Sequence, residues 1–273
     1  MGGVPTSGDA VGAGPVPSIA VTTSDPTLHP TVLVIQNDPT DPPLLAGEWL
    51  GEAGLRLELV EAWSGGPCPT AVPASVSGIL VLGGTPNAHD DIAAPWLPAV
   101  RALMADAVDN DVPVLGLCLG GQLLAAALGG RVELSANTEV GLVYVERTEA
   151  GLLDPVMAQI DAPGDRIPAT QWHQDQIVEL PEGALVLLTN PACRVQAFRY
   201  GASAYGLQMH PEIDARAFDE WATEVDDALL RSGTTGAQAA AEVRLAQGPL
   251  VAAWRPMILA WADLVWAYAT DRR

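Results

Sequence analysis

The sequence predicts an α/β fold of three layers, in which a mostly parallel sheet is covered by helices on both faces, followed by a C-terminal helical extension. Two observations predict it. Between residues 31 and 130, short apolar runs alternate with segments of helical spacing, and the runs at 31–36 and 112–117 are typical of buried parallel strands. After Pro211, Ala and Leu recur at helical spacing to the end of the chain.

Each element follows from its local pattern. The expected strands are runs rich in Val, Ile and Leu, and the expected helices repeat apolar residues three or four positions apart. Gly129 and Gly130 close one helix, since glycine readily takes the left-handed conformation found at helix ends. Strands are expected at 31–36, 55–60, 78–82 and 112–117, and helices at 44–53, 96–110 and 119–128.

From 131 to 209 the pattern changes to short strand candidates separated by Gly, Pro and Asn. Helices are scarce in this stretch, so part of the sheet should be antiparallel. Beyond it the chain becomes helical again. Strands are expected at 140–147, 176–180, 185–189, 194–198 and 204–209, and helices at 215–231, 236–246 and 250–270.

Three regions are predicted: a disordered tail at 1–30, a catalytic domain at 31–213 and a helical extension at 214–273 packed on it. The tail is rich in Gly, Pro, Ser and Thr without periodicity. The apolar segment 249–268 contains Arg255 and Asp263, which a lipid-facing helix tolerates badly, so it is interpreted as a helix docked on protein. Its large apolar residues share one helix face: Trp254, Ile258, Trp261 and Val265.

The charge balance limits the function. With 13 basic and 33 acidic residues, the formal net charge is −20, which disfavours binding to nucleic acid or to an anionic membrane surface. Only 3 cysteines are present, without metal-ligand spacing, and such sparse usage fits a reducing compartment. The first basic residue is Arg56, so no signal-peptide pattern begins the chain. We expect a cytoplasmic protein.

Cys118 is the candidate nucleophile. It lies in the segment 113–122, Pro-Val-Leu-Gly-Leu-Cys-Leu-Gly-Gly-Gln, where a buried strand runs directly into a helix. Gly116 and Gly120 flank it, as the tight turn of a nucleophile elbow requires. The positive end of the helix dipole there favours the thiolate. Cys68 and Cys193 lie in loops, and we interpret both as incidental.

His210 is the candidate base, because it ends a strand and is followed by Pro211 and Glu212. Residues two apart in an extended segment face the same way, so Glu212 can orient the imidazole. His173, in Trp-His-Gln-Asp, competes for this role and is otherwise a candidate for holding substrate together with Asp175. The remaining histidines are His29, in the expected tail, and His89, in a polar loop.

These motifs together resemble the class I glutamine amidotransferase family, which has a flavodoxin-like fold. They are most similar to the members of the family that occur as separate proteins and look like the amidotransferase half of GMP synthase. The resemblance covers about residues 31–213 and rests on the order and spacing of four segments. They are Leu82-Gly-Gly84, Gly116-Leu-Cys-Leu-Gly-Gly-Gln122, Trp172-His-Gln-Asp175 and His210-Pro-Glu212.

The resemblance implies the chemistry. Cys118 would attack the γ-carboxamide of glutamine and form a γ-glutamyl thioester, with His210 relaying protons and Glu212 holding it. The backbone N–H of Leu119 and of Gly83 or Gly84 would form the oxyanion hole. Gln122 and Asp175 would hold the substrate. No metal and no organic cofactor is implied.

The sequence is compatible with several functions. In one alternative, ammonia would pass to a separate synthetase, because no domain that would activate an acceptor substrate is recognisable in the sequence. In the other, the protein is a γ-glutamyl amide or peptide hydrolase. The sequence differs from the usual family pattern at 85–87 and 172–175. These residues are expected to line the substrate end of the site, so both alternatives stay open. A non-catalytic regulator has no need of the Cys-His-Glu set. A chaperone or deglycase with a similar sheet usually has His after the elbow cysteine, where this chain has Leu119.

Overall fold

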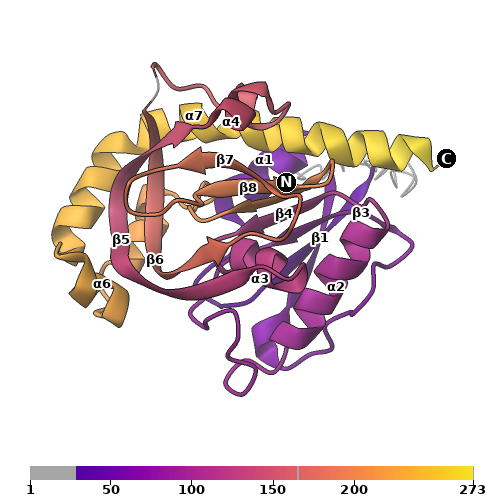
Figure 1. The fold of residues 1–273 in the computed structure, drawn as a ribbon, viewed down its shortest axis with the longest axis horizontal. Helices are drawn as coiled ribbons and strands as arrows, with labels where there is room; N and C mark the ends of the chain where they lie inside the picture. Colours follow the sequence, from indigo (N-terminus) through magenta and orange to yellow (C-terminus); the bar gives the residue numbers. More distant parts are fainter. Residues whose placement is uncertain (1–28, 165, 273) are drawn as a thin grey trace, which may run out of the picture.

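The computed structural model describes residues 29–164 and 166–272, which form one nine-stranded sheet with helices on both faces (Figure 1). The strand order is β2-β1-β3-β4-β9-β8-β7-β5-β6. The strands are β1 Thr31–Gln36, β2 Arg56–Glu61, β3 Val76–Val81, β4 Val114–Leu117, β5 Arg131–Arg147, β6 Ile167–Glu179, β7 Leu185–Thr189, β8 Ala197–Tyr200 and β9 Ala204–Leu207. The helices are α1 Leu44–Glu52, α2 Leu97–Asp109, α3 Leu119–Ala127, α4 Glu149–Leu153, α5 Ala215–Trp221, α6 Asp227–Ser232 and α7 Gly236–Asp271, with short 3-10 turns η1 Ala62–Ser64 and η2 Met157–Gln159.

The sheet is mixed. Strands β2, β1, β3, β4 and β9 are parallel neighbours. From β9 onward, through β8, β7, β5 and β6, every pairing is antiparallel. This confirms the α/β fold class and the antiparallel portion expected after residue 131.

Alternate residues of β1 show why both faces of the sheet are covered. Val32 and Val34 belong to a core shared with α1 and α7, whereas Leu33 and Ile35 belong to a second core shared with α2 and α3. Because neighbouring strand residues point to opposite faces, a continuous apolar run is buried on both sides. The two cores make the three layers visible in Figure 1.

The long ribbon of β5 and β6 corrects the short strands expected at 140–147 and 176–180. The two strands pair with each other along most of their length, with a register irregularity between Leu134 and Glu139. Polar and half-exposed residues interrupt the apolar pattern of both strands, so most of this ribbon could not be predicted from the sequence. His173 therefore lies on β6 and not in an irregular region. The strand expected at 194–198 lies at β8 instead, and α4 was not predicted.

The helices expected at 236–246 and 250–270 are a single helix, α7, with Pro249 and Pro256 inside it. A proline removes one backbone hydrogen bond from a helix interior. Burial of one apolar face outweighs this loss here, because Trp254, Ile258 and Trp261 are almost completely buried in the core. By length and composition α7 could cross a membrane, but its buried face confirms a helix docked on protein.

The predicted tail lies outside the described residues, apart from His29 and Pro30. Nδ1 of His29 is 2.7 Å from the carbonyl oxygen of Gly54. The carbonyl of Pro30 accepts a hydrogen bond of 2.9 Å from the N–H of Arg56. These contacts join the start of β1 to the segment before β2. The predicted boundary between a domain at 31–213 and its extension stays a prediction.

The packing of α7 yields a first prediction. Trp254 is 1% exposed, and its Nε1 donates a hydrogen bond of 2.8 Å to the carbonyl of Pro168 on β6. Trp254→Ala removes the ring and leaves that carbonyl without its donor, so the free energy of unfolding should fall by about 3–5 kcal/mol. Chemical denaturation measures the loss.

Leu245 on the same helix is the matched control, since its side chain is 87% exposed. Leu245→Ala should change the free energy of unfolding by no more than about 0.5 kcal/mol. Equal losses in the two variants would show that α7 is not held by its buried face.

Candidate active site

Cys118 lies at the junction of β4 and α3, in the elbow that the sequence predicts. Its φ of 48° and ψ of −108° are unusual for a residue with a Cβ, and such strained backbone is typical of functional sites. Its N–H donates a hydrogen bond of 2.8 Å to the carbonyl of Leu207, which anchors the elbow on β9. The residue is 7% exposed and lines a cavity.

The elbow forms because its glycines leave room for neighbouring backbone. A Cβ on Gly116 would lie 2.4 Å from the carbonyl oxygen of Gly120, and one on Gly120 would lie 2.1 Å from that of Val81. Both distances are far below van der Waals contact, so the chain cannot turn this tightly with larger residues there. The Gly-x-Cys-x-Gly pattern is therefore a requirement of the backbone geometry.

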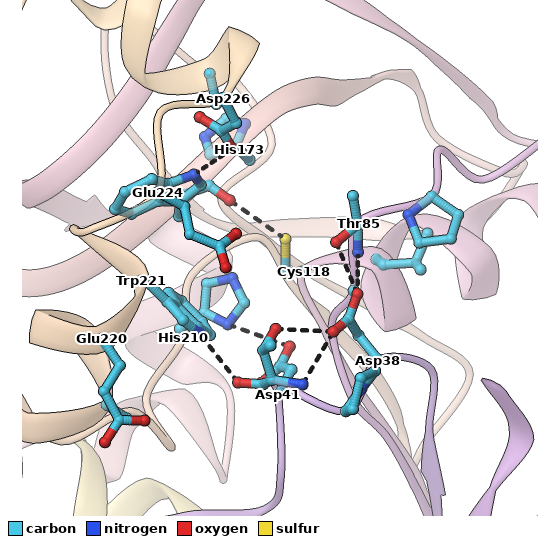
Figure 2. A pocket seen from close by; sticks show the side chains of 18 of the residues that line it. Asp38, Asp41, Thr85, Cys118, His173, His210, Glu220, Trp221, Glu224 and Asp226 are labelled. Atoms are coloured by element: carbon cyan, nitrogen blue, oxygen red, sulfur yellow. Dashed lines mark hydrogen bonds and ion pairs between the residues drawn. The ribbon is translucent and has the colours of Figure 1, made fainter. Parts of the chain in front are cut away.

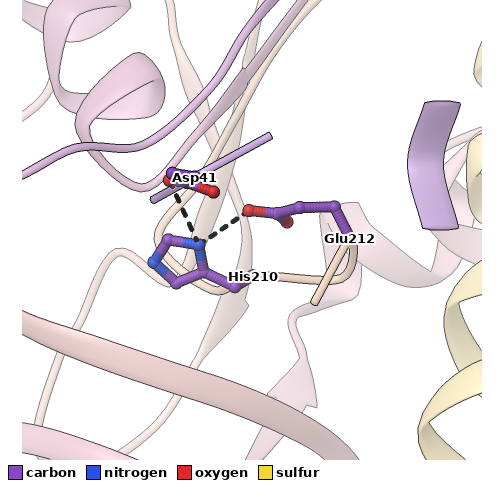
Figure 3. Close-up of side chains that lie close together, drawn as sticks. All are labelled: Asp41, His210 and Glu212. Atoms are coloured by element: carbon purple, nitrogen blue, oxygen red, sulfur yellow. Dashed lines mark hydrogen bonds and ion pairs between the residues drawn. The ribbon is translucent and has the colours of Figure 1, made fainter. Parts of the chain in front are cut away.

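His210 and Glu212 form a buried pair shortly after β9. His210 Nδ1 lies 2.7 Å from Glu212 Oε1, and the two side chains are 3% and 0% exposed (Figure 3). This hydrogen bond leaves Nε2 for Cys118, which β4 brings alongside because it pairs with β9. Burial alone would lower the pKa of His210, but the adjacent Cys118 and Glu212 outweigh burial and raise it well above its ordinary value.

The other two cysteines sit in environments that oppose a thiolate. Burial raises the pKa of Cys68 to about 11. Burial, with the nearby charge of Glu139, raises the pKa of Cys193 to about 12. Both remain thiols at neutral pH, whereas Cys118 lies at the start of a helix beside an imidazole.

The residues expected to form the oxyanion hole surround this centre. Gly84 and Leu119 line the cavity together with Cys118. Gly83 packs behind it, since a Cβ there would lie 2.2 Å from Asp41 Oδ2 and 2.8 Å from His210 Cε1. The structure thus brings the glycine pair and the elbow together, and their role as an oxyanion hole stays a prediction.

The three residues expected to hold substrate also line the cavity, but two have internal partners. Gln122 Nε2 donates to the carbonyl of Asp175 at 3.1 Å and to Gln208 Oε1 at 3.2 Å. His173 Nδ1 is 2.8 Å from the same carbonyl, and its Nε2 is 3.1 Å from Glu139 Oε2. Burial raises the pKa of Asp175, an effect that the nearby His173 partly offsets.

The cavity has a volume of ≈ 830 Å³ and is enclosed in part by the segment joining α5 and α6. Glu220, Glu224 and Asp226 approach from that side, while Asp38 and Asp41 face them across Cys118 and His210 (Figure 2). Acidic side chains therefore predominate among the charged residues that line the cavity.

Tryptophans hold this segment in place. Trp221 packs edge-on against the His210 ring, with centroids 4.9 Å apart, and its Nε1 donates to the carbonyl of Thr40 at 2.9 Å. Trp172 Nε1 donates to Asp226 Oδ2 at 2.8 Å. Sequence reasoning gave Trp221 no functional role, because an aromatic residue in an amphipathic helix carries no signal of what it packs against.

Asp41 was also missed. It is 2% exposed, and its Oδ2 lies 3.9 Å from His210 Nδ1. Burial, with the adjacent charge of Glu212, raises its pKa to about 8. The only sequence signal is an acid in a Pro-rich loop after a strand. Asp41, His210 and Glu212 also have ligand atoms within 4.8 Å of one another, a grouping that could hold a metal ion.

Comparison with known proteins identifies the family of this chain. Residues 50–224 match the sequence pattern of Glutamine amidotransferase class-I. The chain is 33% identical over 135 residues to the glutamine-hydrolyzing GMP synthase of Brucella melitensis, covering 49% of this chain and 25% of that protein. The corresponding enzyme of Brucella ovis gives the same identity over 24% of its length. This chain therefore spans about a quarter of these curated relatives.

Solved structures show the same fold. A glutamine amidotransferase from Thermotoga maritima superposes with a TM-score of 0.74 at 25% identity, covering 86% of this chain and 99% of the other. One from Methylobacillus flagellatus gives a TM-score of 0.69 at 28% identity, covering 89% and 95%. These chains are matched over nearly their whole length.

The elbow glycines give a second prediction. Gly120→Ala would force a Cβ onto the backbone of Val81, so the free energy of unfolding should fall by about 3 kcal/mol, the upper end of overpacking costs. Gly51→Ala is the control, because it lies in α1 with no atom within 4 Å of the new Cβ, and it should stabilise the protein by up to about 1 kcal/mol. Thermal unfolding of both variants compares them. A harmless Gly120→Ala would contradict the elbow geometry.

The pair of Glu139 and His173 gives a third prediction. Burial would raise the pKa of Glu139, but hydrogen bonds from His173, Asn190 and Gln196 outweigh burial and lower it. The ionised form of Glu139 therefore stabilises the folded protein at pH values above the ordinary pKa of a glutamate. This stability is lost as the pH falls through the lowered pKa of Glu139. Glu139→Gln should be less stable than the native protein at pH 7, with a difference that shrinks in acid.

Denaturation curves from pH 7 downward measure this difference, with exposed Glu48→Gln as the control. The control should follow the native protein at every pH. A Glu139→Gln difference that does not shrink in acid would contradict the charge-based account of this pair.

Proposed function

The chain belongs to the class I glutamine amidotransferase family, and we propose that it hydrolyses the γ-carboxamide of glutamine with Cys118 as the nucleophile. The observation that carries the proposal is the buried 2.7 Å hydrogen bond between His210 and Glu212 beside an elbow cysteine. A nucleophile, a base and a group that orients the base are the parts that this chemistry needs.

In the first half of the reaction, the thiolate of Cys118 attacks the γ-carbonyl carbon of glutamine. The carbonyl oxygen becomes an oxyanion, and the imidazolium of His210 gives its Nε2 proton to the departing nitrogen. The C–N bond breaks, ammonia leaves, and a γ-glutamyl thioester remains on Cys118. Glu212 keeps the imidazole in the required orientation through Nδ1.

In the second half, His210 takes a proton from a water molecule, whose oxygen attacks the thioester carbonyl carbon. The C–S bond breaks, glutamate is released, and the Cys118 thiolate again faces an imidazolium. Backbone N–H groups of Leu119 and of Gly83 or Gly84 would stabilise the oxyanion in both halves. Such preorganised donors typically lower a barrier by about 3–4 kcal/mol.

For the substrate, we propose that Asp175 receives the α-ammonium group of glutamine. Gln122 and His173 act by fixing the backbone at Asp175, because both side chains bind its carbonyl oxygen. This positions the Asp175 carboxylate in the cavity wall.

A separate synthetase would use the ammonia. The matched relatives are GMP synthases that hydrolyse glutamine, and this chain corresponds to about a quarter of their length. We therefore propose that an acceptor subunit works with this protein. Which synthetase this acceptor subunit is depends on the substrate that receives the ammonia.

Hydrolysis of larger γ-glutamyl amides or peptides is the second candidate, and one observation favours it. The cavity of ≈ 830 Å³ is within the range of pockets for drug-sized ligands, about 300–1,000 Å³, and so has room beyond glutamine. The same three residues would serve, since only the leaving group differs.

The fourth prediction tests these functions together. Purified protein incubated with L-glutamine should release glutamate, and Cys118→Ala should lower the rate by about 10⁴-fold or more because no other group replaces the nucleophile. Cys193→Ala, which removes another buried thiol, should keep the native rate. An enzyme-coupled glutamate assay gives both rates.

The same assay with γ-glutamyl amides and dipeptides separates the candidates. Faster turnover of these compounds than of glutamine would favour the hydrolase. Activity that survives Cys118→Ala would refute the mechanism. Inactivity of the native protein on every substrate, with and without candidate synthetases, would favour a non-catalytic regulator.

A further inference from the structure

Two carboxyl groups face one nitrogen of the candidate base. Glu212 Oε1 lies 2.7 Å from His210 Nδ1, and Asp41 Oδ2 lies 3.9 Å from it (Figure 3). Asp41 comes from the loop between β1 and α1, far from Glu212 in sequence. Both carboxyl groups are buried, with exposures of 2% and 0%. The mechanism above uses only Glu212.

Such a pair does not carry two negative charges easily. Buried carboxylates close to each other repel, and one imidazolium compensates only one of them. In addition, Asp41 Oδ1 and Glu212 Oε2 are buried without a hydrogen-bond partner among the described residues. A proton on one carboxyl group would reduce the charge and supply a donor for the other.

The geometry indicates which group carries this proton. Glu212 is within hydrogen-bond distance of His210 Nδ1, so its ionised form is stabilised there. Asp41 is more distant from the ring. Burial, then the charge of Glu212, raises the pKa of Asp41 to about 8, with a further increase from Asp38 and a decrease from His210.

Asp41 is also held firmly beside Glu212. Its N–H donates to the carbonyl of Asp38 at 3.2 Å, and the N–H of Leu45 at the start of α1 donates to the carbonyl of Glu212 at 3.0 Å. Its carboxyl group occupies the space where Gly83 would have a Cβ. The loop, the start of α1 and the glycine pair thus fix the acid against the His210–Glu212 pair.

Resting on the proposed function, we propose that Asp41 is a positioning residue whose neutral carboxyl group donates a hydrogen bond to Glu212, and so fixes the carboxylate that orients His210. The reaction would then require Asp41 in its protonated form. Ionisation of Asp41 adds a negative charge beside Glu212, His210 and Cys118. His210 then holds its proton more tightly and gives it less readily to the departing nitrogen.

The fifth prediction follows from this role. The native kcat/KM should fall as the pH rises above about 8, where Asp41 ionises. Asp41→Asn is neutral at every pH and still has N–H donors, so it should keep activity within about threefold at pH 7 and lack this fall. Asp41→Leu has similar size but no donor, and should lose about tenfold at pH 7, the effect of one hydrogen bond to a charged group.

Asp38→Asn is the matched control, because it removes a neighbouring charge and leaves the acid pair intact; it should keep the alkaline fall. The rate of Cys118 alkylation by iodoacetamide, measured against pH, is a readout that needs no substrate. It should show a step near pH 8 in the native protein and none in Asp41→Asn. This readout tests Asp41 even if the native protein does not hydrolyse glutamine.

Carbon-13 NMR of labelled aspartate carboxyl groups in the native protein tests the same point without any variant. One buried aspartate should titrate near pH 8. Titration of every aspartate below about pH 5 would overturn the proposal. So would identical alkaline profiles in native protein and Asp41→Asn, or equal losses at pH 7 in Asp41→Asn and Asp41→Leu. Loss of activity on chelation that Zn²⁺ restores would make the cluster a metal site instead.

Discussion

The close approach of three strands at the elbow is the constraint on which the site depends. At the start of α3 the backbone passes so near Val81 of β3 and Leu207 of β9 that only glycine fits at positions 120 and 121. Cys118 takes a left-handed φ of 48° as a result. Because β9 pairs with β4, the segment after β9 delivers His210 to the same edge of the sheet. Packing of backbone against backbone thus places the thiol and the imidazole together.

Helices α5 and α6 and the segment between them complete the cavity. Trp221 of α5 contacts the His210 ring and binds the loop at Thr40, while Asp226 binds Trp172 on β6. The long helix α7 packs on the same core as β1 and β3. Substitutions in this part of the chain are therefore expected to reach the active site through packing, without touching substrate.

Much of this could be predicted from local sequence. Most of the parallel strands are short apolar runs, and the elbow and the His-Pro-Glu segment are local patterns whose backbone geometry follows from their residues. The full length of the ribbon of β5 and β6 could not be predicted, since its polar residues break the alternation. Nor could the continuity of α7, because burial of one face outweighs Pro249 and Pro256. Asp41 and Trp221 act through partners distant in sequence, so nothing beside them in the chain marks their positions.

In the proposed reaction, Cys118 forms a covalent bond with the γ-carbonyl carbon of its substrate. The most direct measurement is acid quenching of the protein during turnover of L-glutamine, followed by mass spectrometry of its cysteine peptides. We expect a γ-glutamyl group on the Cys118 peptide, which accumulates with burst kinetics if its hydrolysis is slow. Reaction with a γ-electrophilic glutamine analogue should label the same peptide permanently. Labelling of Cys68 or Cys193 in its place, or turnover with Cys118 unmodified by either reagent, would rule out Cys118 as the nucleophile.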